Sequence, residues 1–450
     1  MKEKDRHTSL AAPVPALRLI DAIVLIVGIV IGAGIFRTPS IVAANSPDQY
    51  WFLGAWILGG IISLTGALCY SELSTAFPNA GGDYHFLKTA FGKRFSFLFA
   101  WSRITVTQTG SIALLSYIAG DYLAALHPLG MHSSAIYAAA LVVFLTLVNI
   151  LGIQFGTGFQ KLFMVLQMIS ILIIILTGFL IEPSTPVEIT AVNPDNGISS
   201  KTSFALALIF VLLTFGGWNE AAYISAELKT GSRKMTLVLI VSILIITVVY
   251  LLMNLAFLNV LGLTAMATSE AVGIDMMRVT LGEKGVILIG LMVSLFALTS
   301  LNTTIFTGAR ANYALGKDFA PLAFLGKWNT TRSSPVNSLL LQGMIAVVLI
   351  VFGAFTRSGF ESLVDFTAPV FWFFFLFTGL SLFVLRRKRP DVPRPFKVPL
   401  YPVTPFLFVV LCTYMLYSSL SVTGTGALVG MAVLVVGWGV SFFQRSSKNR

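Results

Sequence analysis

The sequence predicts an all-α membrane protein of about twelve transmembrane helices. Hydrophobic residues make up 56% of the 450 residues and charged residues only 11%, whereas soluble domains carry about 25% charged residues. The mean hydropathy is +0.86. We therefore expect one transmembrane domain over residues 19–444, between cytoplasmic tails at 1–18 and 445–450.

Each predicted helix corresponds to an apolar run that ends at charged residues or at a Pro/Gly-rich loop. In chain order, the expected spans are residues 19–44, 51–77, 95–126, 133–151, 157–181, 203–228, 235–261, 285–315, 336–355, 361–385, 403–420 and 424–444. The polar stretch 262–284 is expected to be a short extracellular connector that covers a vestibule.

Lysine and arginine outnumber the acidic residues and give a net charge of +11. Their positions indicate membrane topology rather than a nucleic-acid partner, because they gather in alternate loops, as cytoplasmic loops require. The clusters are Lys2/Lys4/Arg6/Arg18, Lys88/Lys93/Arg94, Lys229/Arg233/Lys234, Lys317/Lys327/Arg332, Arg386–Arg389 with Arg394/Lys397, and Arg445/Lys448/Arg450. We expect a multi-pass protein of the cell (inner) membrane with both termini in the cytoplasm.

Nothing in the sequence indicates an enzyme. The two cysteines, Cys69 and Cys412, lie in apolar runs, which excludes a disulfide framework and a cysteine metal site. We find no paired-histidine metal motif, no Gly-x-Ser-x-Gly elbow and no phosphate-binding loop. The absence of a Walker motif argues against ATP-driven transport by this chain alone. No cofactor is expected, other than Na⁺ or H⁺ as a coupling ion.

A glycine cluster interrupts the first apolar run at residues 27–36, Val-Gly-Ile-Val-Ile-Gly-Ala-Gly-Ile-Phe. Glycine weakens a helix by roughly 0.5–1 kcal/mol relative to alanine. In hydrocarbon, the freed amides are tolerated only where the broken helix lines a cavity and binds something. The amides at such a break form a positive dipole end that suits a carboxylate. The alternative is a glycine face that serves close helix packing.

A second interruption lies in the sixth span at residues 214–220, Thr-Phe-Gly-Gly-Trp-Asn-Glu. Paired glycine-interrupted spans in corresponding halves of a chain indicate an inverted-repeat transporter with a midplane site. A channel or a transporter-derived sensor is the alternative class. A channel needs a continuous polar pore, whereas two breaks favour a site that can be occluded.

Four motifs resemble the amino acid–polyamine–organocation superfamily, in particular its bacterial L-amino-acid transporter-like permeases. They are Gly32–Phe36; Tyr70–Leu73 with Phe77–Tyr84; Gly216–Asn219 with Ala226–Lys229; and Arg387–Pro390 with Arg394–Leu400. The resemblance implies the leucine-transporter fold, with two inverted five-helix repeats and two further helices. It also implies a permease that moves an L-amino acid by alternating access, as an antiporter or a symporter.

The resemblance further implies which groups hold the substrate between the two breaks. The amides of Gly32, Ala33 and Gly34 would receive the carboxylate, and the carbonyls of Val30 or Ile31 the ammonium. The second break, with Gly217 at its centre, would contribute the carbonyls of Phe215 and Gly216. The ring of Phe215 would close over the substrate, and Asn219 would line its side-chain pocket.

One position departs from the family pattern. Relatives often carry a lysine on helix five where this chain has Gln167, which cannot supply the charge. On helix eight, Thr299 and Ser300 resemble the hydroxyl pair that sodium-coupled members of this fold use. We hypothesise that Na⁺, held by these hydroxyls and by carbonyls near Gly28 and Ile31, replaces the lysine. The alternative is that both hydroxyls bond their own helix.

Among the charged residues within predicted spans, where charge is costly without a partner or water, three are candidates for a role in transport. Glu220, beside the second break, is a candidate for proton relay or for contact with a substrate cation, or else a carboxylate that orders the break. Arg37 and Arg103 are candidates for an ionic gate; the alternative is a snorkelling or structurally paired arginine.

The side chains beside the two breaks indicate the substrate class. Because the pocket offers no committed charge apart from Glu220, a neutral amino acid is expected, and a cationic amino acid or polyamine is the alternative.

The animal heterodimeric members of the family join a glycoprotein through a cysteine in the loop that corresponds to His127–Ser133. This loop has no cysteine, so we expect no disulfide-linked heavy subunit. The sequence does not distinguish exchange from symport, and it does not indicate the oligomeric state.

Overall fold

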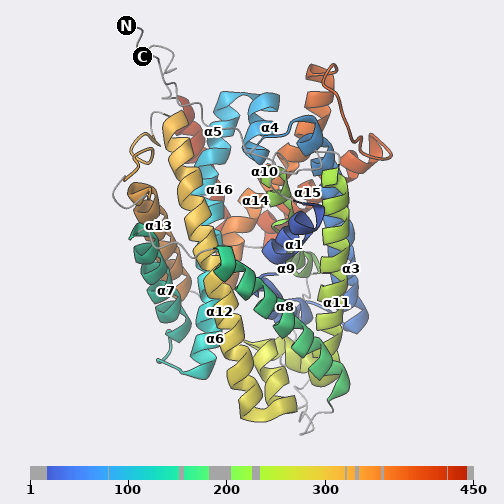
Figure 1. Cartoon of the computed structure of the whole chain (residues 1–450), viewed down its shortest axis with the longest axis vertical. Coiled ribbons are helices and arrows are strands. Elements are labelled where there is room, and N and C mark those ends of the chain that lie inside the picture. Colours follow the sequence, from blue (N-terminus) through green and yellow to red (C-terminus); the bar gives the residue numbers. More distant parts are fainter. Residues whose placement is uncertain are drawn as a thin grey trace.

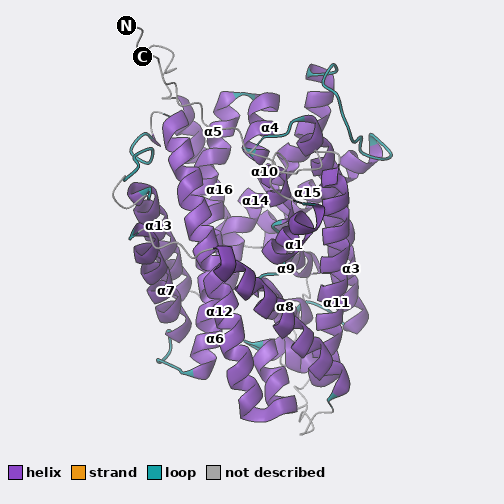
Figure 2. Cartoon of the chain, in the orientation of Figure 1, coloured by secondary structure: helices purple, strands orange, loops and turns teal. Residues whose placement is uncertain are grey.

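The computed structural model describes residues 18–79, 81–151, 157–181, 204–224, 234–319, 322–329, 334–355, 359–422 and 424–442. Within these ranges the regular elements are helices (Figure 2), and extended pairing is limited to an isolated bridge between Asn329 and Ser334. The predicted all-α fold class is confirmed.

The described elements follow the chain as a series of helices, several of them interrupted. They are α1 Leu19–Val30, the 3₁₀ helix η1 Ala33–Phe36, α2 Thr38–Ala44, α3 Gln49–Ala76, α4 Gly82–Phe91, α5 Lys93–Ser102, the π-helix η2 Arg103–Thr107, α6 Gln108–Leu126, α7 Ser133–Ile150, α8 Thr157–Leu180, α9 Phe204–Thr214, the 3₁₀ helix η3 Trp218–Glu220, α10 Ala221–Ile224, α11 Met235–Thr268, α12 Val272–Asp318, α13 Val336–Ala354, α14 Gly359–Lys388, α15 Val403–Val422 and α16 Gly424–Phe442.

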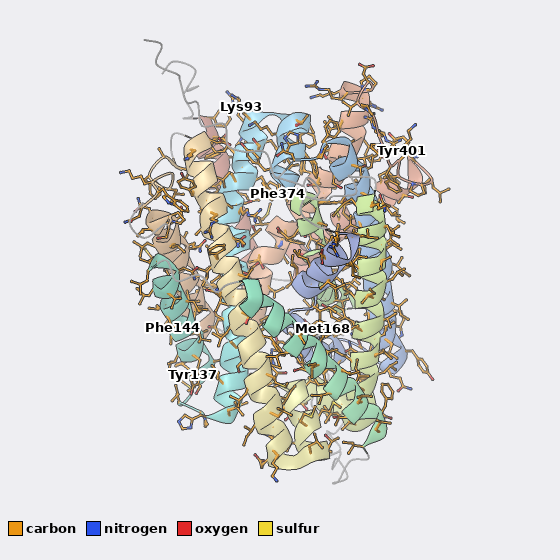
Figure 3. The ribbon with its side chains drawn as sticks, viewed as in Figure 1. Lys93, Tyr137, Phe144, Met168, Phe374 and Tyr401 are labelled. Carbon is orange, nitrogen blue, oxygen red and sulfur yellow. The ribbon has the colours of Figure 1, made fainter. Side chains whose placement is uncertain are left out.

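Eight of the described helices are long and apolar enough to cross a membrane, and the shorter apolar helices are Leu19–Val30, Val165–Leu180, Phe204–Glu220 and Gly426–Phe442. Each corresponds to one predicted span. Apolar side chains cover the outside of the bundle: Phe144 on α7 is 60% exposed and lies at the outer edge in Figure 3. Such a surface is suited to lipid rather than to water.

The stretch 262–284, predicted to be a short connector, is largely helical. The chain changes direction at Gly262 (φ 74°) and Gly282 (φ 64°), where glycine tolerates a left-handed backbone. Between them Val272, Ile274 and Met276 are buried. These apolar side chains fold the segment back onto the bundle; the sequence prediction did not anticipate its helical form, and its extracellular location stays a prediction.

The two interrupted helices lie inside the bundle and touch each other. In Figure 1, α1 and α9 lie near its middle, with α8 crossing diagonally in front and α11 beside them; α1 packs on η3, and α2 packs on α9. Around them α6 packs along α7 and α12, and α14 along α15 and α16. The arrangement agrees with the leucine-transporter fold that the motifs imply.

The bundle has two ends, which we name by their elements. The α4 end carries α4 and α5 (top of Figure 1), and the α11–α12 end carries the junction of α11 and α12 (bottom of Figure 1). At the α4 end, Glu72 is 2% exposed and is bound by Arg386 through two hydrogen bonds, by Arg394 Nε (3.4 Å) and by the N–H of Val398 (2.7 Å). Glu72 therefore fixes the segment after α14 against α3.

Candidate functional site

The first break separates α1 from η1. Ile31 (φ −74°, ψ 79°) and Gly32 (φ −104°, ψ −166°) leave the helical conformation. The N–H of Gly32 donates to the carbonyl of Val30 (2.8 Å), which occupies one of the three amides predicted to receive a carboxylate. The N–H groups of Ala33 and Gly34 begin η1, where backbone donors have no helical acceptor. These two amides best fit the predicted role.

The second break separates α9 from η3. Gly217 has φ 111° and ψ −22°, a left-handed conformation that glycine adopts without steric cost. A Cβ at this position would lie 3.1 Å from Cγ2 of Ile29, at the end of α1. The hydroxyls of Thr214 and Thr38 are 2.7 Å apart, which joins α9 to α2. The two breaks therefore meet, as the predicted site between them requires.

A buried tyrosine on α11 links the two breaks. The hydroxyl of Tyr250 lies 2.9 Å from the carbonyl oxygen of Val30 and 3.0 Å from that of Thr214. These are the last helical carbonyls before each break, and a helix end leaves such acceptors without partners. Because Tyr250 lies near the middle of the long helix α11, both breaks lie at mid-height in the bundle.

The carbonyls predicted to hold the ammonium have partners in this structure. Val30 O receives both the Gly32 N–H and the Tyr250 hydroxyl, and Ile31 O receives Nε2 of Gln167. The carbonyls of Phe215 and Gly216 lie beyond the last turn of α9 and remain the candidates at the second break.

Phe215 is packed into the core rather than exposed at the edge of a cavity. Its ring is fully buried and contacts Tyr250 edge-on (centroids 5.0 Å) and Trp56 (6.4 Å). Both partners pack tightly, since Trp56 also contacts Tyr250 (5.6 Å). For Phe215 to close over a substrate, its ring has to leave this cluster.

Gln167 occupies the position where the resemblance expects a lysine, and its side-chain amide donates a hydrogen bond, as an ammonium would. It is buried on α8 and donates from Nε2 to Ile31 O. That carbonyl is also one of the predicted sodium ligands, so a donor already points at it. On α12, the carbonyls of Thr299 and Ser300 accept from the hydroxyls of Thr303 (2.9 Å) and Thr304 (2.8 Å). Sodium binding stays a prediction.

Arg37 lies toward the α11–α12 end. Its Nη1 donates to the carbonyl of Glu270 (2.7 Å), and its Nε lies 3.8 Å from Oδ2 of Asp121 on α6. Next to it, Tyr122 donates to the carbonyl of Phe36 (3.0 Å). These contacts tie the segment after the first break to α6, as expected of an ionic gate or a structural pair.

A cavity of about 380 Å³ opens beside Arg37. Its wall includes residues of α2, α9, α11 and the start of α14: Arg37, Ser40, Ile41, Ala44, Asn45, Leu206, Phe210, Ala267, Thr268, Ser269, Glu270, Glu361 and Asp365. The cavity therefore lies between the first break and the α11–α12 end, and it is large enough for a small solute.

Asn219, Glu220 and Arg103 gather at the opposite end around a residue that the sequence reasoning missed, Asp83 on α4. The amide of Asn219 and the charges of Glu220 and Arg103 act on the Asp83 carboxyl, and the hydroxyl of Thr378 lies 3.4 Å from its Oδ1. Asp83 follows a Gly-Gly pair outside the apolar runs, so only its burial, which the sequence does not reveal, sets it apart.

Tyr250 and Asp121 were missed as well. Tyr250 interrupts the aliphatic run Ile243–Leu255, and a buried phenol normally has a hydrogen-bond partner, which is a signal that could have found it. Asp121 lies within the third predicted span, where a carboxylate is costly without a cation. Pairing it with Arg37 requires knowing that α6 packs against η1.

A helical bundle with two touching helix breaks at its middle defines a solute transporter of the broken-helix type. The family model described as amino acid permease matches residues 17–441, and the chain belongs to this family. The b(0,+)-type amino acid transporter 1 of Mus musculus is 31% identical over 88% of this chain and 81% of its own length. The large neutral amino acids transporter small subunit 2 of Mus musculus is 30% identical over 94% and 80%.

Proposed function

We propose that this chain is a secondary active transporter that moves L-amino acids, neutral ones by preference, across the cell membrane by alternating access. The observation that carries the proposal is the meeting of the two breaks at Tyr250, which brings free helix-end amides of η1 and carbonyls after α9 to one depth of the bundle. Such groups recognise an α-carboxylate and an α-ammonium without side-chain charge.

The preference for neutral substrates rests on the side chains beside the breaks. Within described residues 204–224 the acidic side chain is Glu220, and it lies with Arg103 in the cluster around Asp83. A cationic substrate side chain would therefore meet a carboxylate that already has a basic neighbour. Cationic amino acids or polyamines are the alternative, and the relatives include a b(0,+)-type transporter.

We further propose that the chain works without a disulfide-linked partner and with both termini in the cytoplasm. The large neutral amino acids transporter of Mus musculus is named a small subunit. Here, however, the chain has two cysteines, and both are buried, so neither is positioned to form an intermolecular disulfide. The alternate loops that carry the basic clusters support the orientation. An unchanged electrophoretic mass with and without reductant in membranes is the expected result.

Transport is tested with the purified chain in liposomes. Uptake of labelled neutral amino acids is compared between empty and amino-acid-loaded vesicles, each in sodium and in choline medium. Uptake into loaded vesicles alone, indifferent to sodium, indicates exchange and removes Thr299 and Ser300 from the site. Sodium-dependent uptake into empty vesicles indicates symport.

Matched controls separate the remaining outcomes. Protein-free vesicles and labelled lysine or putrescine run in parallel. Uptake of the cations alone would overturn the neutral preference and draw attention to Glu220. A current that persists without exchange of solute would indicate a channel, and no flux of any of these solutes would contradict the transport proposal.

A further inference from the structure

A buried carboxyl at the α4 end has no role in the proposed site. Asp83 lies in the first turn of α4 and is 4% exposed. An acidic residue in the first helical turn is favoured by the helix dipole, but at this position it is also enclosed. A carboxylate without water requires hydrogen bonds or a cation around it.

The groups around Asp83 come from four other elements. They are the hydroxyl of Tyr70 on α3, Arg103 at the start of η2, Asn219 and Glu220 on η3, and the hydroxyl of Thr378 on α14. The basic end of α14 is engaged elsewhere, since Arg386 binds Glu72 and Lys388 donates to the carbonyl of Ala90. Of the part of the chain that the structure describes, the charged groups that act on the Asp83 carboxyl are therefore the Glu220 carboxyl and the Arg103 guanidinium.

This environment favours a proton on Asp83. Burial, with the nearby Glu220, raises the pKa of Asp83 from 3.8 to about 6, although Tyr70, Asn219 and Arg103 act in the opposite direction. A carboxyl open to water keeps a pKa of about 4, so the enclosed arrangement binds a proton roughly 100-fold more tightly than an open one. Acid therefore stabilises the enclosed arrangement.

We propose that Asp83 is a proton-binding site that controls the opening of the α4 end beside the second break. Protonation of Asp83 removes the buried charge, so α4 stays packed on α10, the helix that follows η3. Loss of the proton places a buried negative charge near Glu220, and the repulsion between them favours separation of α4 from the segment after the second break. This inference rests on the proposed transport function, since Asn219 belongs to the predicted substrate pocket.

The pH dependence of the enclosed arrangement follows from the difference in proton affinity between the enclosed and the open arrangement. The arrangement in which Asp83 is enclosed is favoured below pH 6 and loses its advantage as the pH rises through 6. Exchange that requires this end to open is then slow at pH 5 and several-fold faster at pH 7.5, with a midpoint close to pH 6.

The test follows the midpoint of exchange in a set of variants of the full chain in liposomes. Asp83→Asn, a mimic of the protonated form, is expected to be slow and independent of pH. Tyr70→Phe removes a group that stabilises the ionised form and moves the midpoint upward. Glu220→Gln removes a like charge and moves it downward. A merely structural role of Asp83 would not shift the midpoint in opposite directions in these two variants.

His85 lies on the same helix and requires its own control. Burial and the neighbouring Lys88 lower the pKa of His85 below its ordinary value, so its titration has to be separated from that of Asp83. His85→Gln and the exposed Asp391→Asn are expected to leave the midpoint unchanged. A midpoint that disappears in His85→Gln and persists in Asp83→Asn would overturn the proposal.

A readout without amino acid separates this inference from the transport proposal. Trp218 is buried next to Asn219 and contacts Tyr70 edge-on (centroids 5.1 Å). The fluorescence emission of Trp218 is obtained in nanodiscs as the difference between the natural chain and Trp218→Phe. We expect this emission to change with a midpoint close to pH 6, and to stay constant with pH in Asp83→Asn. If the Trp218 emission titrates but no amino acid is taken up, the transport proposal is refuted and the proton site is retained. If amino acids are taken up but the emission does not titrate, the proton site is refuted.

Discussion

At the scale of single residues, Tyr250 is the group that defines the centre of the site. Its single hydroxyl hydrogen is shared between the carbonyls of Val30 and Thr214. Both acceptors belong to helix ends, and the Tyr250 side chain that joins them is fully buried. A substrate ammonium that approaches these carbonyls has to compete with this hydroxyl.

Tyr250→Phe is expected to lower the free energy of unfolding by about 1–2 kcal/mol, because it leaves a buried acceptor without its donor. We also expect a weaker apparent affinity for substrate, since the geometry of both breaks depends on this hydroxyl. Thermal unfolding in detergent and the KM of exchange measure the two effects.

Tyr117→Phe is the matched control for this residue. The Tyr117 hydroxyl donates to the carbonyl of Ile350 (2.7 Å), between α6 and α13. The Tyr117→Phe substitution is expected to lower the free energy of unfolding by a similar amount and to leave the KM of exchange unchanged. Equal changes of KM in the two variants would contradict a specific role for Tyr250.

At the scale of elements, the second break depends on a glycine whose neighbours leave no space for a side chain. Gly217→Ala imposes a left-handed backbone on an L-residue, which costs roughly 1–2 kcal/mol. The added methyl group also lies 3.1 Å from Ile29 Cγ2, so the side chain of Ile29 on α1 has to give by a few tenths of an ångström. We expect exchange to fall at least tenfold.

Gly130→Ala isolates the backbone contribution. Gly130 has φ 108° and no atoms within 4 Å of an added Cβ. It should therefore show the same stability loss without the loss of exchange. If both variants exchange equally, contact between the two breaks has no part in transport.

The breaks could be predicted from the sequence because their signal is local: both are glycine clusters inside apolar runs. The partners of these breaks could not, because they lie far apart along the chain. Tyr250 is 220 residues from Val30, and Thr378 is 295 residues from Asp83. The helical form of 262–284 was missed for a similar reason, since its burial depends on the bundle that it packs against.

At the scale of the whole molecule, the two ends carry ion pairs of unequal strength. At the α4 end, Glu72 is almost fully buried and binds Arg386, Arg394 and the N–H of Val398. At the α11–α12 end, Arg37 and Asp121 are 3.8 Å apart, partly exposed, and adjacent to the cavity. A buried charge that loses its partner costs about 3–5 kcal/mol, and a partly exposed pair contributes about 1 kcal/mol or less. This structure is therefore closed at the α4 end and accessible from the other.

A native cysteine can report this asymmetry. Cys69 lies one helical turn before Glu72 and is fully buried, so a maleimide should label it slowly. Glu72→Gln, made in a Cys412→Ala background, removes the charge that Arg386 and Arg394 bind, and we expect the labelling rate of Cys69 to rise at least tenfold, since a factor of ten corresponds to about 1.4 kcal/mol. Asp121→Asn in the same background removes a weak pair at the far end and should leave the rate unchanged. Equal labelling in the two variants would mean that Glu72 does not control access at the α4 end, because closing this end would then depend on helix packing alone.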